Sequence, residues 1–279
     1  MFEKFKNRYI IEGDLAAVTA LHIGAAEDEF KPGGCKNPFF RNADGLPLIP
    51  GSSLKGAMRN FLGQYLSTEA GKDLLLKDVP YEKEICSEQN PCTAQLKDEI
   101  KKWKKQKENV EEKISGYLFG TENGVGGKLC MVCRLFGSPY SAAKLSIRDA
   151  RVVEETFRGE FEIRSGVAID RNLGISVKNK KFTTETVPQG TVFSFKAVLE
   201  NADSYEWNAV TRLLQAMELG MIQIGGMKSR GLGEISLINI RYQYVNEKNL
   251  AEYLSGEGFR FKDFHDKREK EKRHVPGIN

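Results

Sequence analysis

Four cysteines form two pairs whose spacing suits a metal ion. Cys86 and Cys92 are separated by five residues, Cys130 and Cys133 by two, and 37 residues lie between the pairs. Four thiolates make a closed tetrahedral site for structural zinc, and the two-residue gap is ordinary for such ligands. A disulfide framework is not expected in a chain long enough to bury a core. The pattern favours zinc over four free thiols, while Cys35 stands apart.

A second pattern, LPLIPGSSLKGAMRNFL at 46–62, combines a turn, two hydroxyls and two cations. It predicts a helix capped by Ser52 or Ser53, with free backbone N–H groups that suit a phosphate. Lys55 and Arg59 are four residues apart and therefore share one helix face. A phosphodiester backbone fits this arrangement. A capped amphipathic helix with a solvated basic face fits it equally, and the GxxxxGK[ST] order of a Walker loop is absent.

Glycines surround a further pair of cations in IGGMKSRGLGEI, residues 224–235. Glycine lets the backbone approach a ligand closely, while Lys228 and Arg230 offer charge and Ser229 a hydroxyl. A tight turn between a helix and a strand explains the same glycines. In a ferredoxin-like fold this position can lie near the first helix, so the two basic segments are expected to share a target.

The composition is that of an ordinary globular protein. The 279 residues are 40% hydrophobic and carry a formal net charge of +4, too small an excess to identify a nucleic-acid-binding protein by charge alone. No stretch approaches the roughly 20 apolar residues that cross a bilayer, and charges occupy the N-terminal region where a signal peptide is apolar. We expect a cytoplasmic location and no membrane partner.

The elements that must position these residues follow the order strand, helix, strand, strand, helix, strand. Apolar residues at Tyr9–Ala20 predict the first strand, and the stripe that begins at Leu54 predicts the first helix. The alternation in TVFSFKAVLE predicts a strand, Trp207 begins a second helical stripe, and Gly233–Val245 predicts the last strand. This order predicts an α+β fold with a ferredoxin-like (RRM-like) βαββαβ core, which commonly presents an open sheet face to RNA.

Two regions are expected outside that core. Residues 67–144 show no regular core pattern and hold both cysteine pairs with a charge-dense stretch. We predict a zinc-binding insertion that needs the metal as a cross-link because it has little apolar material. The core then comprises residues 1–66 and 145–250, and the charge-rich 251–279 is predicted to be a mobile tail.

The two basic motifs, together with LHIG at 21–24, resemble the RAMP (repeat-associated mysterious protein) superfamily, and within it the backbone subunits of type III CRISPR effectors. The resemblance runs from about Phe5 to Tyr244 and includes LCMVCRLFG and RSGVAIDRNLG. It implies that the chain binds guide crRNA and single-stranded target RNA and stacks with other effector subunits in a filament. The guide-binding residues that it implies are His22, Ser52, Ser53, Lys55, Arg59, Lys228, Ser229 and Arg230.

The resemblance also implies a thumb, a β-hairpin at about 164–188 that wedges into the guide–target duplex, with Ile169, Asp170 and Arg171 in its core. An apolar wedge beside a guanidinium can replace lost base stacking, on the order of 1–3 kcal/mol per base. A mobile hairpin fits the same residues. His22 matches the histidine of the family's LHIG motif, although one histidine among apolar neighbours is also typical of a structural residue.

The loop that carries a catalytic aspartate in target-cleaving relatives departs from their pattern here. Where that aspartate precedes Asn-Pro, this sequence has Lys36, which cannot bind Mg²⁺ or act as a carboxylate. Asp28 is the remaining candidate, since Asp44 beside Gly45 suits a turn. We therefore expect a subunit that holds guide and target RNA for antiviral defence, with weak or absent nuclease activity and with Mg²⁺ only if it cleaves.

Three alternatives stay open at this point. The subunit could be purely structural and only space its neighbours in the complex. The chain could be an active metal-dependent target-RNA endonuclease. It could instead be a metal-independent endoribonuclease that processes CRISPR transcripts with a histidine as general base.

Overall fold

The computed structural model describes residues 4–25, 35–86, 91–106, 108–120, 126–256 and 260–265. At its centre is a five-stranded antiparallel sheet in the order β3-β7-β1-β8-β9. Its strands are β1 (Asn7–Ala17), β3 (Leu145–Ile147), β7 (Val192–Glu200), β8 (Ile235–Asn246) and β9 (Lys262–Asp263). Two strand pairs lie beside it, β2 (Leu48–Ile49) with β4 (Ala150–Arg151), and β5 (Glu162–Ile169) with β6 (Ser176–Thr186).

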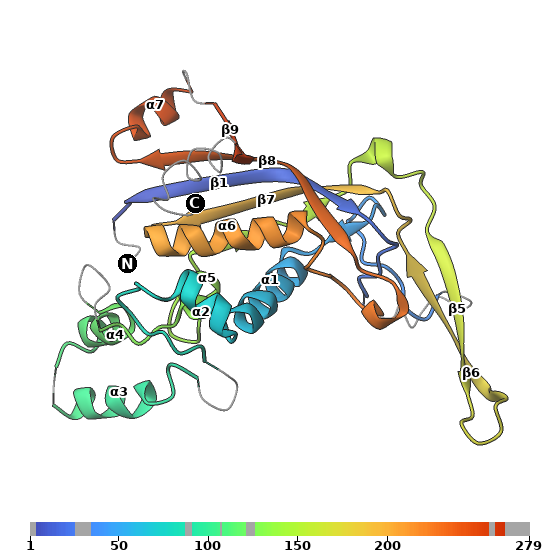
Figure 1. Cartoon of the computed structure of the whole chain (residues 1–279), viewed down its shortest axis with the longest axis horizontal. Coiled ribbons are helices and arrows are strands. Elements are labelled where there is room, and N and C mark those ends of the chain that lie inside the picture. The colour runs from blue at the N-terminus through green and yellow to red at the C-terminus, as the bar shows by residue number, and fades with distance from the viewer. Residues whose placement is uncertain are drawn as a thin grey trace, which may run out of the picture.

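Two long helices, α1 (Gly51–Leu66) and α6 (Ser204–Glu218), lie on one face of this sheet (Figure 1). α1 connects β1 to β3, and α6 connects β7 to β8, so these elements have the connectivity of a split βαβ core. The mixed α+β fold with an antiparallel sheet agrees with the expected ferredoxin-like arrangement. Shorter helices are α2 (Glu69–Leu75), α3 (Leu96–Lys105), α4 (Val110–Phe119), α5 (Met131–Phe136) and α7 (Leu250–Ser255), with 3₁₀ turns at Glu154–Thr156 and Lys228–Arg230.

Side-chain periodicity explains why the central elements form. In β7 every second residue is buried against the helices: Phe193, Phe195, Ala197 and Leu199. In α1 the buried residues recur at helical spacing: Leu54, Met58, Leu62 and Leu66. α6 begins with a capping box, in which Asp203 accepts from the backbone N–H of Glu206 at 2.8 Å, and Glu206 accepts from that of Asp203 at 2.9 Å.

The region 67–144 contains more apolar packing than the sequence suggested. Leu75, Leu96 and Leu118 are buried, and Trp103 packs edge-on against Tyr117. The residues of α5 are buried too, where this helix contacts α1 and α6. The expectation of little apolar material was therefore wrong, because helices of six to ten residues are too short to show a clear periodicity. A metal is not the only factor that holds this region together.

Part of the predicted tail packs against the sheet. Within 251–279, α7 and β9 pack on the edge of the sheet, and the ring of Phe264 is only 3% exposed. The guanidinium of Arg241 lies 4.8 Å from the ring of Phe261. Phe261 and Phe264 therefore pack against the fold from within a charge-rich run, while the mobility of 251–279 stays a prediction. No helix in the described ranges is both long and apolar enough to cross a bilayer.

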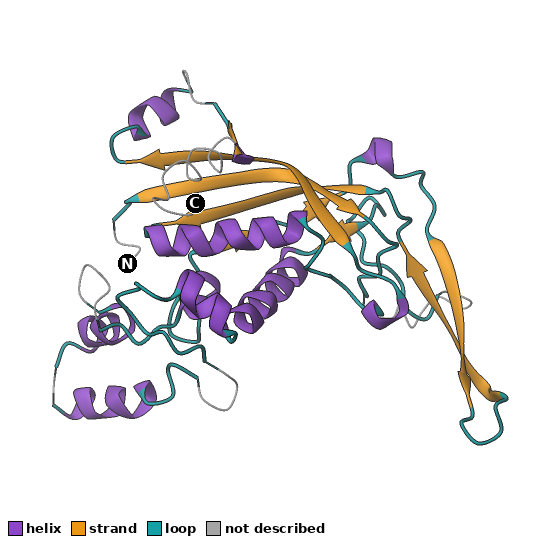
Figure 2. Ribbon diagram, viewed as in Figure 1, coloured by secondary structure: helices purple, strands orange, loops and turns teal. Residues whose placement is uncertain are grey.

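The β5–β6 hairpin projects away from the rest of the fold (Figure 2). It lies where the resemblance placed the thumb. α3 and α4 lie at the opposite end of the molecule (Figure 1). The elements between these two ends carry the two basic motifs.

Candidate functional site

The N-terminus of α1 differs from the sequence prediction. Its N-cap is Pro50, with no side-chain cap, so neither Ser52 nor Ser53 caps the helix. The first N–H, that of Gly51, donates instead to Oδ1 of Asp149 at 2.8 Å. Gly51 packs so closely against the carbonyl that ends β3 that a Cβ would collide with it. A carboxylate, and not an open N–H cradle, occupies the helix end, while Ser52 is exposed and Ser53 half-buried.

Lys55 and Arg59 share one face of α1, as predicted, but their environments differ. Both border a shallow pocket of about 380 Å³ that Ser138 and Ser141 also line. Lys55 has no hydrogen-bond or ion-pair partner among the described residues. The guanidinium of Arg59 donates from Nη1 to the carbonyl of Gly137 at 2.9 Å, and Nη2 lies 3.7 Å from a cysteine sulfur. Lys55 is therefore available for a phosphate, whereas Arg59 is already engaged.

Two exposed arginines near this helix end escaped the sequence analysis. Arg148 lies in the turn after β3, whose backbone closely approaches Gly51. Arg151 pairs with Leu48 in the β2–β4 ladder. The signal was the sequence RDAR at 148–151, near the start of the second core segment at 145–250. The chain thus brings Arg148 close to the carboxylate-capped end of the helix that carries Lys55, with Arg151 in the adjoining β2–β4 ladder.

The glycine-rich loop packs on the backbone of the LHIG segment. Gly225 has φ +77°, and a Cβ there would collide with the carbonyl oxygen of His22. The N–H of Gly226 donates to that same oxygen at 2.9 Å. The close approach that glycine permits is thus to His22 and not to a ligand. Lys228 and Ser229 are exposed in the 3₁₀ turn that follows.

His22 is buried, at 8% exposure, and its Nδ1 lies 2.7 Å from the carbonyl oxygen of Glu185 in β6. The carboxylate of Glu185 accepts from the N–H of Phe39 and forms an ion pair with Arg41, both at 2.9 Å. Asn37 donates to the Thr183 carbonyl at 3.1 Å. The LHIG segment, the glycine-rich loop, the loop at 35–41 and the hairpin base therefore meet at one place.

The loop that corresponds to the aspartate-bearing loop of target-cleaving relatives is described only from Cys35 onward. Lys36 is exposed, and its backbone N–H donates to Oγ1 of Thr183 at 3.2 Å, so a lysine lies beside the hairpin base. Asp28 lies outside the described residues. Asp44 sits in the turn expected of it, where its N–H donates to Oδ1 of Asn42 at 3.0 Å.

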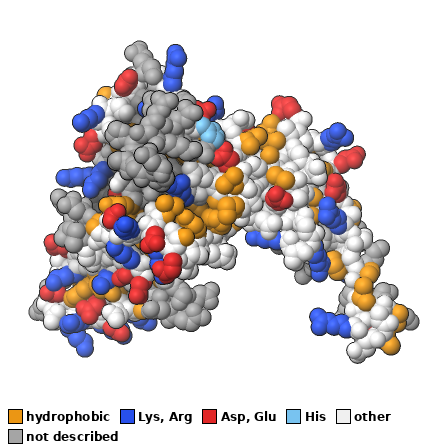
Figure 3. Space-filling view, viewed as in Figure 1, with side chains coloured by type: hydrophobic (Ala, Val, Ile, Leu, Met, Phe, Trp, Pro, Cys, Tyr) orange, Lys and Arg blue, Asp and Glu red, His pale blue; other side chains and the backbone are white. Residues whose placement is uncertain are grey.

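The hairpin carries exposed apolar side chains far from the core (Figure 3). Ile169 and Leu173 are 63% and 70% exposed. Asp170 closes the tip, because its Oδ1 accepts from the N–H groups of Asn172 and Leu173 at 2.9 and 3.0 Å. Arg171 is exposed. Of the three residues named for the thumb, Ile169 and Arg171 are presented outward and Asp170 shapes the turn.

The predicted loop cation Arg230 contacts the hairpin. Its guanidinium lies 5.4 Å from the ring centroid of Phe182, within the range of a cation–π contact. Phe182 in turn pairs across the hairpin with Gly166. Arg230 thus connects the glycine-rich loop to the base of β6.

The outer face of the sheet does not resemble an RNA platform. Glu12 in the central strand pairs with Lys196 and Arg241, at 2.5 and 3.1 Å. Although burial alone would raise it, the pKa of Glu12 is lowered by these hydrogen bonds and charges. Asp14 accepts from Asn239 at 2.7 Å on the same surface. These two carboxylates offset the two cations, so the groups give this face no excess of positive charge that would favour a phosphate backbone.

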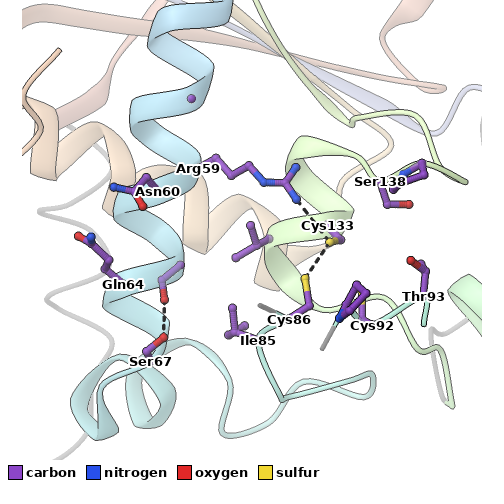
Figure 4. Close-up of a pocket in the computed structure, with 15 residues that line it drawn as sticks. Arg59, Asn60, Gln64, Ser67, Ile85, Cys86, Cys92, Thr93, Cys133 and Ser138 are labelled. Carbon is purple, nitrogen blue, oxygen red and sulfur yellow. Dashed lines mark hydrogen bonds between the residues drawn. The ribbon is translucent and has the colours of Figure 1, made fainter. Parts of the chain in front are cut away.

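The four predicted metal ligands converge. The sulfur atoms of Cys86, Cys92, Cys130 and Cys133 all lie within 4.8 Å of one another. Cys86 is 3.3 Å from Cys133 and 3.7 Å from Cys130 (Figure 4). Four sulfurs bound to zinc at about 2.3 Å are separated by about 3.8 Å, so these distances fit one metal ion. Hydrogen bonds from the neighbouring thiols, that of Cys130 first, lower the pKa of Cys86.

A wider cavity of about 560 Å³ borders this cluster (Figure 4). One wall is the polar face of α1, with Asn60 and Gln64, and Ser67 at its C-terminal cap, and the other contains Cys86 and Cys133. Arg59 extends across it towards Cys133. The cysteine cluster thus lies beside the same helix that carries Lys55.

Similar proteins identify the family. The chain is 28% identical to the CRISPR system Cms endoribonuclease Csm3 of Methanothermobacter thermautotrophicus, over 91% of each chain. It is 27% identical to the protein of that name from Methanocaldococcus jannaschii, over 85% of this chain and 81% of the relative. A third relative of the same name, from Enterococcus italicus, is 35% identical over 25% of this chain. The sequence profile of the RAMP superfamily matches residues 14–236, so the chain belongs to the RAMP superfamily.

Proposed function

We propose that the chain is a backbone subunit of a type III CRISPR effector complex that binds guide crRNA and holds target RNA for antiviral defence. Two relatives named Csm3 match it over most of both chains. The observation that carries the proposal is the meeting of the LHIG segment, the glycine-rich loop and the hairpin base through His22. Its Nδ1 contacts the Glu185 carbonyl, and its own carbonyl accepts from Gly226.

The proposed roles of the predicted residues divide into contact and support. Lys55, Lys228 and Ser229 are the guide-backbone contacts, because their side chains are accessible on α1 and on the loop. Ser52 and Ser53 offer hydroxyls at the start of α1. Support comes from residues that are already bonded within the fold: His22, Arg59, Asp170 and Arg230.

For the hairpin we propose the thumb role. Ile169 and Leu173 expose apolar surface to water at its end, and Arg171 adds an exposed guanidinium nearby. Such surface is stabilised when it stacks on bases that the hairpin separates. Other subunits of the same complex, stacked along one guide in a filament, are the expected protein partners.

We propose that the subunit itself cleaves target RNA weakly or not at all, because Lys36 occupies the loop position where a carboxylate would bind Mg²⁺. A second candidate function, target-RNA endonuclease, is favoured by the relatives, which are named endoribonucleases. Transcript processing with His22 as general base is disfavoured, since that ring is buried and Nδ1 is engaged.

A cleavage assay separates the two candidates. End-labelled target RNA is incubated with guide-loaded protein and Mg²⁺, using the wild type, Asp28→Asn and Lys36→Asp. We expect a weak cut or none with the wild type, the same with Asp28→Asn, and a stronger cut with Lys36→Asp, which places a carboxylate at that position. A mapped cut in the wild type that Asp28→Asn abolishes would establish the endonuclease and overturn the proposal.

RNA binding itself is tested by fluorescence anisotropy with labelled single-stranded guide RNA across a salt series. Several phosphate contacts release counterions, so affinity should fall steeply as salt rises. Duplex DNA of equal length is the control and should bind more weakly. Guide affinity that does not change with salt would rule out a phosphate-holding subunit.

We further propose that the cysteine cluster binds one structural zinc ion, since four thiolates form a closed tetrahedral site of the kind that zinc occupies. Native mass spectrometry tests this with Cys133→Ser and, as a matched control, Cys35→Ser. We expect one zinc ion in the wild type and in Cys35→Ser and a clear loss in Cys133→Ser. Metal retained in Cys133→Ser would contradict the assignment.

A further inference from the structure

One arginine of α1 contacts the cysteine cluster. Nη2 of Arg59 lies 3.7 Å from Sγ of Cys133, and Nη1 donates to the carbonyl oxygen of Gly137 at 2.9 Å (Figure 4). Cys133 belongs to α5, and Gly137 is the residue at which α5 ends. The two arms of the guanidinium therefore reach one sulfur of the cluster and the end of the helix that carries it.

The charge of a filled site explains why a cation lies there. Four thiolates around a divalent ion leave two net negative charges, and Cys130 and Cys133 are both buried. Burial of uncompensated charge is costly, and a cation within hydrogen-bonding range offsets that cost. Groups that hydrogen-bond to metal ligands also orient them and tune the strength of metal binding.

The geometry favours arginine over lysine at this position. A guanidinium presents several N–H donors in a rigid plane, so that it can satisfy the Gly137 carbonyl and the Cys133 sulfur together. A cation is also stabilised at the C-terminal end of a helix, where carbonyl groups such as that of Gly137 point outward. Lys55, one turn earlier on the same face, lacks such contacts.

We propose that Arg59 is a positioning residue of the metal centre, which hydrogen-bonds the metal-bound thiolate of Cys133 and fixes this site to α1. The inference rests on the proposed zinc site. It removes Arg59 from the set of phosphate contacts. It also means that metal binding holds the region of α5 against the helix face that carries Lys55.

The experiment measures zinc affinity by competition with a chromophoric chelator, and the absorption of the Co²⁺-substituted protein. The variants are Arg59→Gln and Arg59→Lys, with Lys55→Gln as the control for loss of a neighbouring cation. Loss of an outer hydrogen bond typically weakens metal binding about 10- to 100-fold, which is the effect expected for Arg59→Gln. Arg59→Lys should recover part of the lost zinc affinity, and Lys55→Gln should have the zinc affinity of the wild type.

Two readouts separate this role from simple packing. The sulfur-to-cobalt charge-transfer band should shift in Arg59→Gln, because a thiolate that loses an N–H donor becomes a stronger electron donor. Salt dependence of guide binding should stay unchanged in Arg59→Gln, whereas loss of a phosphate contact would lower the slope by about 0.7. If Arg59→Gln unfolds, Arg59→Lys, which keeps the charge and loses the fork, still provides the zinc affinity and the position of the charge-transfer band.

The outcomes are distinguishable. A wild-type protein that binds neither zinc nor cobalt removes the metal site and the inference together. If the wild type binds metal and Arg59→Gln keeps both the wild-type zinc affinity and the wild-type charge-transfer band, the inference about Arg59 is overturned while the metal site stands. A reduced salt slope with unchanged metal affinity would return Arg59 to the phosphate contacts.

Discussion

A buried ion pair connects the end of the region 67–144, which contains the four cysteines, to α6. Nζ of Lys144, directly before β3, lies 2.7 and 2.6 Å from the two carboxylate oxygens of Glu206. Their side chains are 6% and 0% exposed. Burial raises the pKa of Glu206 and lowers that of Lys144, and their mutual attraction only partly opposes this. Lys144→Met should therefore leave a carboxyl that must fold in its protonated form.

The unfolding free energy that Lys144→Met loses depends on pH. Protonation of a carboxyl whose ordinary pKa is 4.5 costs about 1.4 kcal/mol for each pH unit above that value. For Lys144→Met the loss in unfolding free energy is thus about 4 kcal/mol at pH 7.5 and about 1.4 kcal/mol at pH 5.5. Because the pKa of Glu206 is higher in the folded state, the loss must grow as pH rises. The loss of about 4 kcal/mol at pH 7.5 agrees with the cost of removing one partner of a buried ion pair in other proteins, which is about 3–5 kcal/mol.

Urea unfolding at the two pH values, followed by circular dichroism, measures this difference. Lys72→Met is the matched control, because Lys72 pairs with Glu69 on the surface and its loss should cost less than about 0.5 kcal/mol at either pH. In Lys144→Met/Glu206→Gln the buried charge is absent and the amide oxygen can still accept from the N–H of Asp203, so most of the stability should return. A loss below about 1 kcal/mol, or one that is equal at pH 5.5 and 7.5, would refute the reasoning.

Three further substitutions test the surroundings of the proposed RNA site. Gly225→Ala should weaken guide binding and lower thermal stability, since its Cβ would collide with the carbonyl of His22; normal values for both would contradict that packing. Phe182→Ala should lower the hydrogen-exchange protection of β6 without changing the salt slope, because it removes the surface on which Arg230 rests; unchanged protection would argue against this contact. Gly51→Ala should lower the melting temperature, because the helix end must move away from β3, and an unchanged value would refute the close approach.

Much of the core was predictable from local patterns. The alternation of Phe193 and Phe195 and the helical stripe from Leu54 depend only on side-chain periodicity, and the structure confirms both. The helices near Trp103 were missed because short helices reveal no period. Phe264 was missed because charged neighbours dominate its surroundings in the sequence.

The site was predictable in its residue types but not in its partners. The spacing of the four cysteines predicted that they share one metal site, and their sulfur atoms do lie close together. The cap of α1 comes from Asp149, and Arg59 reaches Cys133, both through contacts between residues far apart in the sequence. Local spacing contains no information on such contacts, so the cations could not be sorted into those that bind RNA and those that support the fold.

The most direct test of guide binding is the salt dependence of guide RNA affinity in Lys55→Gln/Lys228→Gln. Its charge-matched control is Lys97→Gln/Lys105→Gln, which removes two exposed lysines of the distant α3 region. If Lys55 and Lys228 each hold a phosphate, the slope of log affinity against log salt should fall by about 1.4 in the first variant and stay at the wild-type value in the control. Equal slopes in both variants and the wild type would contradict the proposed guide-binding surface.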